Sequence, residues 1–349
     1  MVSSCTYTLS NNVNIFFTDS GAPPGSRDYT TLVLLHGSAF TGDTFEKLHA
    51  LAHRSNLRTI IWNRRDYPGS TRYSDDELQE LHNGEKTFLD RLATEMGEFL
   101  LQFIEKEAVP KISPDRKLGG FAILGWSMGT TTAMALFADA NLLSRAEYNV
   151  LESYVKDLIF YDPPFISLGI EVPDDANPYD PWVDPEYKTA EELYENFRQW
   201  VTGYYNHPSC PTIYNMDFRK RSDQRSCTSW TPEQWIKYYD EGAAVRSELK
   251  MYTPPMSPKI KEMAQSVLFD ESVVRSFFPQ VPVTYMAASR STWHCIWSIL
   301  ETKRIYQWHS NEGHKTRQIR FFTIEGGNHF VHYDNPESLI TSILASIRA

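Results

Sequence analysis

The sequence predicts an α/β fold, in which a mostly parallel sheet is flanked by helices and a helical domain is inserted in the middle of the chain. Short apolar runs alternate with segments of helical periodicity in the first half, as in successive βα units. One of these runs, Phe121–Leu124, leads directly into the pentapeptide Gly125-Trp126-Ser127-Met128-Gly129. The composition changes after about residue 166, where prolines and aromatic residues become frequent.

Strands are expected where apolar and β-branched residues form short runs between turn residues. In chain order these runs are Val13–Phe17, Leu32–Leu35, Thr59–Trp62, Phe121–Leu124, Asp157–Tyr161, Val281–Met286 and Ile319–Ile324. An amphipathic helix is expected between the third and fourth runs, because apolar residues recur there every three or four positions. Its apolar positions are Leu89, Leu92, Met96, Phe99, Leu100 and Phe103.

Ser127 is the candidate nucleophile. A serine on a sharp turn from a strand to a helix has a strained backbone, and glycines on both sides allow the strand and the helix to cross closely. Gly125 and Gly129 meet this requirement. The turn also places the Met128 N–H at the start of a helix, where the helix dipole favours developing negative charge. An ordinary glycine-rich turn is the alternative interpretation.

A serine hydroxyl is a weak nucleophile at neutral pH, so a base and a group that orients the base are needed. His329 is the candidate base, because it lies in the loop after the late strand Ile319–Ile324. The order serine, acid, histidine along the chain agrees with this role. A surface histidine in a glycine-rich turn is the alternative, and the nearby His332 is expected to have a packing or supporting role.

Asp162 is the candidate acid. It comes directly after the strand Asp157–Tyr161, whereas the segment 287–292 after the next strand contains no carboxylate. Because proline follows Asp162, a simple aspartate that starts a turn is the alternative. Asp334 is the second candidate for the acid, although we expect it to cap the last helix.

Two backbone N–H groups are expected to stabilise the oxyanion that forms in the transition state. One belongs to Met128 and the other to Ser38, which follows the strand Leu32–Leu35 in the motif His36-Gly37-Ser38. Gly37 allows the backbone to approach a substrate closely. The loss of one such donor typically costs about 3 kcal/mol of transition-state stabilisation. His36 itself is expected to be structural.

In these motifs the chain resembles the α/β-hydrolase superfamily, in the branch with a lid domain after the sixth strand. The residues that carry the resemblance are His36-Gly37-Ser38, the pentapeptide around Ser127, Gly327-Asn328-His329 and the loop from Trp62 to Ser70. They cover roughly residues 1–165 and 280–349. The resemblance implies a serine hydrolase of the esterase or lactonase type. The chain departs from the usual pattern because it has no carboxylate after the seventh strand, but relatives with the acid after the sixth strand make Asp162 reasonable.

The predicted domains are an α/β-hydrolase core of residues 1–165 and 278–349 and a helical lid of residues 166–277. Because the lid comes between the sixth and seventh strands, we expect it to cover the nucleophile, exclude water and shape the substrate cavity. Most of its aromatic residues are expected to pack in its own core. Trp126, Trp293 and His294 are the candidate substrate contacts.

Composition restricts the partners. A chain of 349 residues with 41% hydrophobic content can bury a full core and carry an inserted module. The formal net charge of −10 disfavours a nucleic acid or an anionic membrane as partner. The basic run Arg219-Lys220-Arg221 is therefore expected to be a solvated face. No segment approaches the roughly 20 apolar residues of a membrane span, and a cytoplasmic location is expected.

No cofactor and no metal is expected. The sequence has no glycine-rich phosphate loop with lysine and no H-E-x-x-H pattern. His49 and His53 have the spacing of a metal-binding pair, but no cluster of carboxylates or cysteines accompanies them, so we expect them on a helix surface. The four cysteines are too few for a disulfide framework, although a pairing of Cys210 with Cys227 is left open.

The candidate residues together predict a serine hydrolase that acts on an ester, lactone or thioester of a mainly apolar small molecule through an acyl-enzyme. The same groups would also serve a non-hydrolytic enzyme, such as an acyltransferase, cyclase, lyase or C–C hydrolase. A ligand receptor that kept the scaffold is a third alternative. Epoxide and haloalkane hydrolases of the superfamily need an aspartate in place of Ser127, so they are disfavoured. Nothing in the sequence indicates the oligomeric state.

Overall fold

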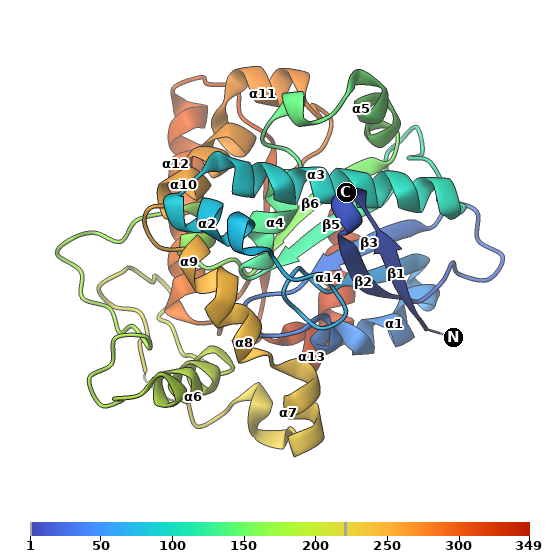
Figure 1. Ribbon diagram of the computed structural model, residues 1–349. Coiled ribbons are helices and arrows are strands. Elements are labelled where there is room, and N and C mark those ends of the chain that lie inside the picture. The colour runs from blue at the N-terminus through green and yellow to red at the C-terminus, as the bar shows by residue number, and fades with distance from the viewer. Residues whose placement is uncertain (1, 220–221) are drawn as a thin grey trace.

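The apolar runs predicted as strands lie together in an eight-stranded sheet of the computed structural model, which describes residues 2–219 and 222–349 (Figure 1). The strands are β1 (Ser3–Thr8), β2 (Asn14–Asp19), β3 (Thr30–Leu35), β4 (Leu57–Trp62), β5 (Phe121–Trp126), β6 (Val155–Tyr161), β7 (Val283–Ala288) and β8 (Ile319–Ile324). Their order across the sheet is β1-β2-β4-β3-β5-β6-β7-β8. β1 and β2 are antiparallel to their neighbours, and β3 to β8 pair in parallel. The predicted mostly parallel α/β sheet is therefore confirmed.

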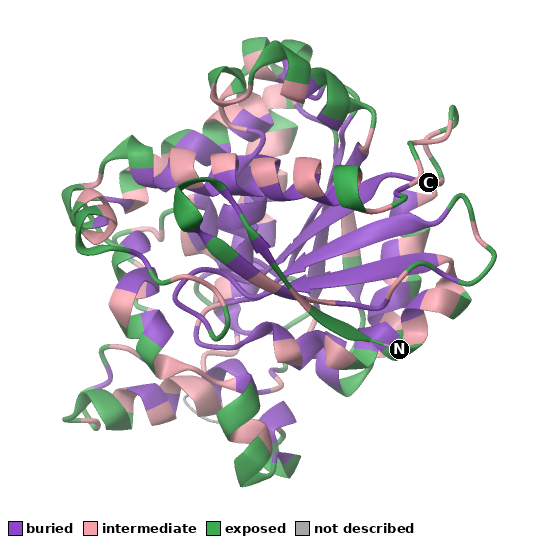
Figure 2. Ribbon diagram, turned by 45° about the vertical axis from the view of Figure 1, so that its right-hand side comes forward, coloured by how far each residue is buried: buried purple, intermediate pink, exposed green. Residues whose placement is uncertain are grey.

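β1 is the strand that the sequence analysis missed. It lies at the edge of the sheet and most of its residues are exposed. It therefore lacks the continuous apolar run that marks a strand buried on both faces. The central strands β3, β5 and β6 do have that pattern, since every residue in them is buried (Figure 2).

Helices flank both faces of the sheet (Figure 1). They are α1 (Glu46–Ala52), α2 (Asp75–Asn83), α3 (Lys86–Lys106), α4 (Gly129–Ala135), α5 (Arg145–Glu152), α6 (Ala190–Val201), α7 (Pro232–Tyr238), α8 (Glu241–Ala243), α9 (Leu249–Met251), α10 (Ser257–Phe269), α11 (Glu271–Ser276), α12 (Trp293–Asn311), α13 (Val331–Asp334) and α14 (Pro336–Ile347). α3, α4 and α10 contribute to the core on one face, and α1 and α14 to the core on the other.

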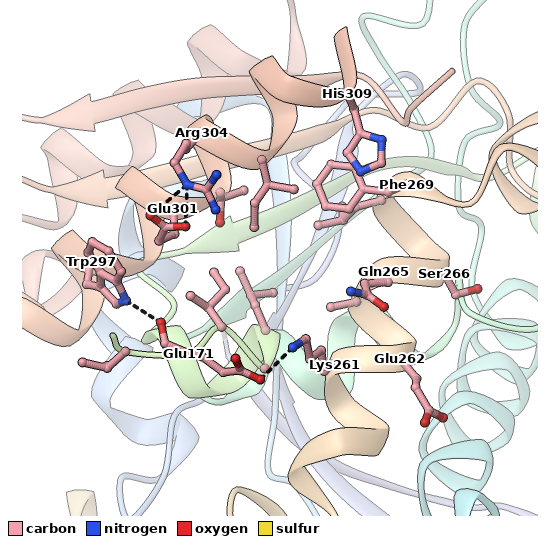
Figure 3. Close-up of a pocket in the computed structure, with 18 of the residues that line it drawn as sticks. Glu171, Lys261, Glu262, Gln265, Ser266, Phe269, Trp297, Glu301, Arg304 and His309 are labelled. Carbon is pink, nitrogen blue, oxygen red and sulfur yellow. Dashed lines mark hydrogen bonds and ion pairs between the residues drawn. The ribbon is translucent and has the colours of Figure 1, made fainter. Parts of the chain in front are cut away.

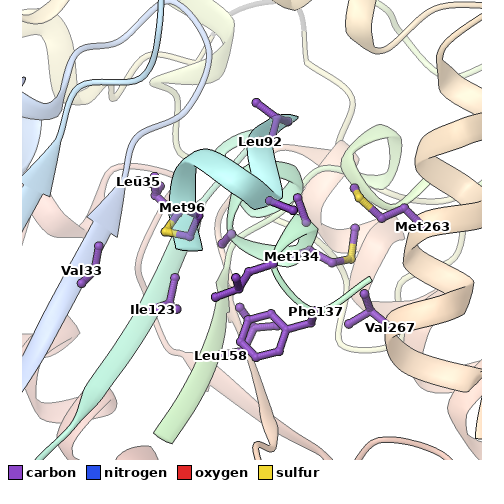
Figure 4. Close-up of a cluster of buried hydrophobic side chains, with 14 of the residues drawn as sticks. Val33, Leu35, Leu92, Met96, Ile123, Met134, Phe137, Leu158, Met263 and Val267 are labelled. Atoms are coloured by element: carbon purple, nitrogen blue, oxygen red, sulfur yellow. The ribbon is translucent and has the colours of Figure 1, made fainter. Parts of the chain in front are cut away.

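The predicted amphipathic helix corresponds to α3, and its six predicted apolar positions are all buried. They belong to a core that also contains Met134 of α4, the adjacent Phe137 and Val267 of α10 (Figure 4). Burying an apolar side chain of this size contributes about 1.5–3 kcal/mol relative to leaving it exposed. This core holds α4 against the sheet, and thereby fixes the turn between β5 and α4.

Residues 166–277, which we call the inserted segment, connect β6 to β7 and contain α6 to α11. Its aromatic side chains make contacts with one another, and Trp182 stacks on Phe197 with 4.4 Å between the ring centroids. The segment also contacts the core directly, because α10 buries Ile260 and Val267 in the same cluster as α4. The limits of a separate lid domain remain a prediction.

Several surface expectations can be compared with the structure. Lys220 and Arg221 of the basic run lie outside the described residues, whereas Arg219 forms an ion pair with Asp217. All cysteines in the described chain are free, including Cys210 and Cys227. Over residues 2–219 and 222–349, no helix combines the length and the apolar character that a membrane span needs.

His49 is buried, which corrects the expectation that it lies on a helix surface. It belongs to α1, and its two ring nitrogens lie 2.9 Å from the hydroxyl of Thr18 and 2.7 Å from that of Thr59. Both hydroxyls come from strands that α1 covers. Burial lowers the pKa of His49 to about 4, so the ring is neutral at pH 7.

When the pH is lowered from 7 to 5, the free energy of unfolding should decrease in both the wild type and a His49→Gln variant. We expect the decrease to be about 2 kcal/mol smaller in the variant. In the unfolded chain His49 has a pKa near 6.5 and binds a proton over this range, whereas folded His49 does not. Protons therefore favour the unfolded wild type. Urea unfolding of both proteins at the two pH values measures the difference, and equal losses would contradict the prediction.

Candidate active site

Ser127 lies in the turn between β5 and α4. Its φ angle of 53° is in the left-handed region, which side chains rarely adopt, so the surrounding structure holds it in a strained conformation. The flanking glycines make the close crossing possible. A Cβ atom on Gly125 would lie 2.5 Å from the Cα of Thr130, and one on Gly129 would lie 2.5 Å from the carbonyl oxygen of His36. A larger residue at either position would force the helix away from the strand.

Asp162 and His329 form a buried hydrogen-bonded pair. The Nδ1 atom of His329 lies 2.6 Å from Oδ2 of Asp162, whose side chain has no exposed surface. The carboxylate also accepts a hydrogen bond of 2.9 Å from the Ala288 N–H and one from the Ser291 hydroxyl. Because the carboxylate can only accept, Nδ1 carries the proton and Nε2 is left free to act as a base.

The turn after β7 has no carboxylate, but it supplies the donors that hold Asp162. β7 lies between β6 and β8 in the sheet, so Asp162 at the end of β6 reaches across the end of β7 to His329. Asp162 has a φ angle of 50°, which belongs to the same strained region as that of Ser127. Cys295 closes the other side, since its Sγ lies 3.2 Å from the Asp162 carbonyl oxygen and 3.6 Å from His329 Nδ1.

Ser127 and His329 line the same cavity. The indole N–H of Trp126 donates to the His329 carbonyl oxygen at 3.0 Å, and the two rings lie 5.0 Å apart between centroids, so Trp126 supports the loop of His329. Among the described residues, no hydrogen bond joins the Ser127 hydroxyl to Nε2 of His329. Proton transfer therefore requires these two atoms to approach each other, and catalytic hydrogen bonds commonly tighten when a substrate binds.

The N–H groups of Ser38 and Met128 have no hydrogen-bond partner within the described residues. Both residues line the cavity together with Ser127. A backbone donor next to a largely apolar cavity needs an acceptor from solvent or ligand. Two such donors beside a nucleophile have the arrangement that stabilises an oxyanion.

His36 has a structural position beneath this loop. Its Nε2 accepts from the Arg64 N–H at 3.0 Å, so Nδ1 must carry the proton and donates to the Gly37 carbonyl oxygen at 2.9 Å. Burial, followed by the positive charge of Arg64, holds the pKa of His36 well below its usual value. A neutral ring with one donor and one acceptor satisfies both contacts.

The cavity beside Ser127 has a volume of about 580 Å³ and a mainly apolar wall. The inserted segment contributes Val172, Trp182, Phe197, Trp200, Leu249 and Tyr252 to it. The predicted contacts Trp293 and His294 line the cavity from the start of α12. Trp126 also borders it, although its ring is fully buried and contacts His329.

A few polar groups in this wall are unsatisfied within the described chain. They include the indole N–H of Trp200 and the Ser38 hydroxyl. The partly exposed ring of His294 also lines the cavity, and it makes aromatic contacts such as the one with Trp200 at 4.8 Å between centroids. Burial, followed by the nearby His329, lowers the pKa of His294 to about 3, so it is neutral. The sequence analysis missed Trp200, because one tryptophan in an aromatic-rich segment carries no local signal.

The other candidate residues lie away from the Asp162 carboxylate. Asp334 accepts hydrogen bonds from the hydroxyls of Tyr204 and Ser226. It does not cap α14, because the side chain of the next residue, Asn335, accepts the N–H there. His332 is buried against Trp126, with 4.4 Å between the ring centroids, which agrees with a packing role.

A second hollow of about 900 Å³ lies between α10, α12 and residues 168–174 (Figure 3). It is larger than the cavity at Ser127 but contains none of the candidate catalytic residues. Four of its charged side chains form two ion pairs, between Lys261 and Glu171 and between Arg304 and Glu301. Val172 lines both hollows. Chemistry rather than size therefore identifies the cavity at Ser127 as the candidate active site.

Within the described residues, Asp162, Cys295 and His329 form a group whose ligand atoms all lie within 4.8 Å of one another, as a metal site would require. Here Nδ1 of His329 and Oδ2 of Asp162 already bond each other at 2.6 Å. A metal would have to break that bond. The arrangement fits an acid that orients a base better than it fits a metal centre.

Comparison with known proteins shows to which family this chain belongs. Among solved structures, the fold is similar to the esterase EaEST from Exiguobacterium antarcticum, with a TM-score of 0.54, 15% sequence identity and coverage of 99% of this chain and 100% of that one. It is also similar to a variant of the epoxide hydrolase from Solanum tuberosum, with a TM-score of 0.55, 12% identity and coverage of 100% and 99%.

A third similar structure is a variant of the N-acyl homoserine lactonase AidH complexed with N-hexanoyl homoserine, with a TM-score of 0.55, 12% identity and coverage of 100% of this chain and 97% of that one. At these identities the likeness shows the fold alone. No curated protein sequence matches the chain. The family model described as the alpha/beta hydrolase family matches residues 32–341, so the resemblance seen in the sequence is confirmed and the chain belongs to the alpha/beta hydrolase family.

Proposed function

We propose that this protein is a serine hydrolase that cleaves an ester, lactone or thioester of a mainly apolar small molecule through an acyl-enzyme. The observation that carries the proposal is the buried pair of Asp162 and His329, whose histidine lines one cavity with Ser127. The His329–Asp162 bond of 2.6 Å leaves Nε2 as the base on the side of the ring away from the carboxylate.

In the proposed reaction, the Ser127 hydroxyl attacks the substrate carbonyl carbon while Nε2 of His329 takes its proton. Asp162 stabilises the imidazolium that forms, and the N–H groups of Ser38 and Met128 bind the oxyanion. When the intermediate collapses, His329 gives the proton to the leaving oxygen or sulfur. Water, deprotonated by His329, then attacks the acyl-enzyme, and the acid product leaves with Ser127 restored.

The cavity supports a neutral, largely apolar substrate. Its volume of about 580 Å³ is in the range of small-molecule sites, and its aromatic wall favours apolar groups. A neutral oxygen on the substrate would accept a hydrogen bond from the neutral ring of His294, which lines the cavity. We further propose that the inserted segment acts as the lid, because it supplies much of the cavity wall and would exclude water during the reaction.

Covalent labelling tests the proposal. We expect a fluorophosphonate to react with the folded protein, peptide mass spectrometry to find the adduct on Ser127, and p-nitrophenyl esters of short apolar acids to be hydrolysed. Absence of labelling would overturn the proposal and favour a ligand receptor. Labelling without turnover of p-nitrophenyl esters, thioesters or lactones would instead favour a non-hydrolytic enzyme.

A further inference from the structure

A buried charged network lies behind the candidate oxyanion loop, residues 36–39. Its members are Arg64 and Tyr67 from the loop after β4, and Glu248 from the inserted segment. All three side chains are buried, and Glu248 has only 2% of its surface exposed. Glu248 ends the π-helical turn Ala244–Glu248 and precedes Leu249, which lines the cavity at Ser127. The network therefore joins the inserted segment to the core at the edge of the site.

Two contacts reach the backbone of the oxyanion loop. Nη2 of Arg64 forms an ion pair with Glu248 and donates to the Gly37 carbonyl oxygen at 2.9 Å. The Tyr67 hydroxyl donates to Oε2 of Glu248 at 2.5 Å and accepts from the Ala39 N–H at 2.7 Å. The Ala39 N–H also lies 3.3 Å from Glu248 Oε2. Both neighbouring peptides of Ser38 are thus held by the network.

The anchored carbonyl determines where the Ser38 N–H points. In a trans peptide the C=O and the following N–H point in opposite directions, and the peptide between Gly37 and Ser38 is trans. Arg64, together with His36, holds the Gly37 carbonyl toward the buried side of the loop. The Ser38 N–H consequently points the opposite way, and it has no partner within the described chain.

The buried charge of Arg64 is balanced by the carboxylate of Glu248, which comes from the inserted segment. Burial acts to lower the pKa of the Arg64 guanidinium, but the negative charge of Glu248 keeps the pKa above its usual value. Burial and then Glu248 raise the pKa of Tyr67 well above its usual value, so the phenol stays protonated and donates to Glu248. Without Glu248, a buried guanidinium would have no counter-charge. The residue after Ser38, Ala39, has a φ angle of 63°, so the loop depends on external contacts to hold its shape.

We propose that Glu248 is a positioning residue that couples the packing of the inserted segment against the core to the formation of the oxyanion hole. When the segment is packed against the core, Glu248 holds Arg64 and Tyr67. These two side chains hold the peptides on both sides of Ser38 in the orientation that stabilises an oxyanion. When Glu248 is withdrawn, Arg64 and Tyr67 lose their shared partner, and the Gly37–Ser38 peptide is held less firmly in that orientation. This inference rests on the proposed function.

The test compares Arg64→Met/Glu248→Met with a matched control. The double variant replaces the buried ion pair with apolar side chains of similar volume, so it should keep the fold. It also removes the hydrogen bond from Arg64 to the Gly37 carbonyl oxygen. We expect kcat for a p-nitrophenyl ester to fall about 10- to 100-fold with KM within about twofold, because the lost contact acts on the transition state. Glu248→Gln, which keeps the shape of the side chain, is also expected to lower kcat. It provides the test if the double variant does not fold.

The control is Arg246→Met. Arg246 lies in the same turn as Glu248 and also bridges to the core, through Asp66 at 2.8 Å and the Tyr73 carbonyl oxygen at 2.7 Å, but it does not touch residues 36–39. We expect its kcat to stay within about twofold of the wild type. An equal loss of kcat in the control would overturn the inference, since any loosening of the segment would then suffice.

A structural measurement separates this inference from the proposed function. A crystal structure of the double variant is expected to show the Gly37–Ser38 peptide rotated, with the Ser38 N–H turned from the cavity. An unchanged peptide, or wild-type kcat in a folded double variant, would overturn the role of Glu248 and leave the serine mechanism intact. A wild-type protein that a fluorophosphonate does not label would overturn the mechanism itself, whatever the peptide does.

Discussion

Replacing Ser127 with alanine is expected to lower kcat for ester hydrolysis by about 10⁴- to 10⁶-fold, because the substitution removes the hydroxyl on which the proposed acyl-enzyme forms. The substitution removes one oxygen and leaves the turn between β5 and α4 otherwise intact. The residual activity should reflect only binding and the two oxyanion donors. Steady-state turnover of a p-nitrophenyl ester measures the loss, and circular dichroism measures whether the fold is kept.

The matched control is Ser276→Ala, at an exposed position of α11 that does not line the cavity. This variant should keep the wild-type kcat. If Ser127→Ala retained more than about one percent of the wild-type kcat, water would be attacking the substrate directly and Ser127 would not be the nucleophile.

Replacing Asp162 with asparagine is expected to lower kcat by about 10⁴-fold, the size of the effect in other Ser-His-Asp enzymes, while the fold is kept. The Ala288 N–H donates to Oδ1, so the amide oxygen of an asparagine would take that place. Its NH₂ group would then face Nδ1 of His329 as a donor. Nδ1 would have to accept, and the ring proton would move to Nε2, which could no longer take the proton of Ser127.

Asp334→Asn is the matched control for this change, because Asp334 was the second candidate acid and bonds only Tyr204 and Ser226 among the contacts described above. Its kcat is expected within about fivefold of the wild type. Near-normal activity of Asp162→Asn combined with a large loss for Asp334→Asn would move the role of the acid to Asp334. Thermal unfolding of both variants checks that the difference in kcat does not come from lost stability.

The parts of the fold that sequence patterns predict are those that local physics determines. Continuous apolar runs such as Phe121–Leu124 are required by strands that are buried on both faces, and the periodicity of α3 is required by a helix with one face on a sheet. The turn at Ser127 is equally local, because the glycines and the serine are adjacent. By contrast β1, which is mostly exposed, shows no such run.

The partners of each candidate group could not be predicted from the sequence, because they come from distant segments. Nothing around Ser291 indicates that its hydroxyl would bond Asp162, and nothing around Glu248 indicates that it would meet Arg64 behind the oxyanion loop. Asp334 shows the same difficulty. A carboxylate just before a proline-containing helix start favours a cap, yet tertiary contacts with Tyr204 and Ser226 engage it and leave the cap to Asn335.

The position of the candidate acid Asp162 after β6 has a consequence for how the substrate preference of this chain could change. Ala288 at the end of β7 and Ser291 in the following turn hold the carboxylate of Asp162. Trp293 and His294, which come next at the start of α12, line the cavity and do not contact that carboxylate. We therefore expect that substitutions at Trp293 and His294 can change which molecule is accepted while the support of the candidate acid is kept.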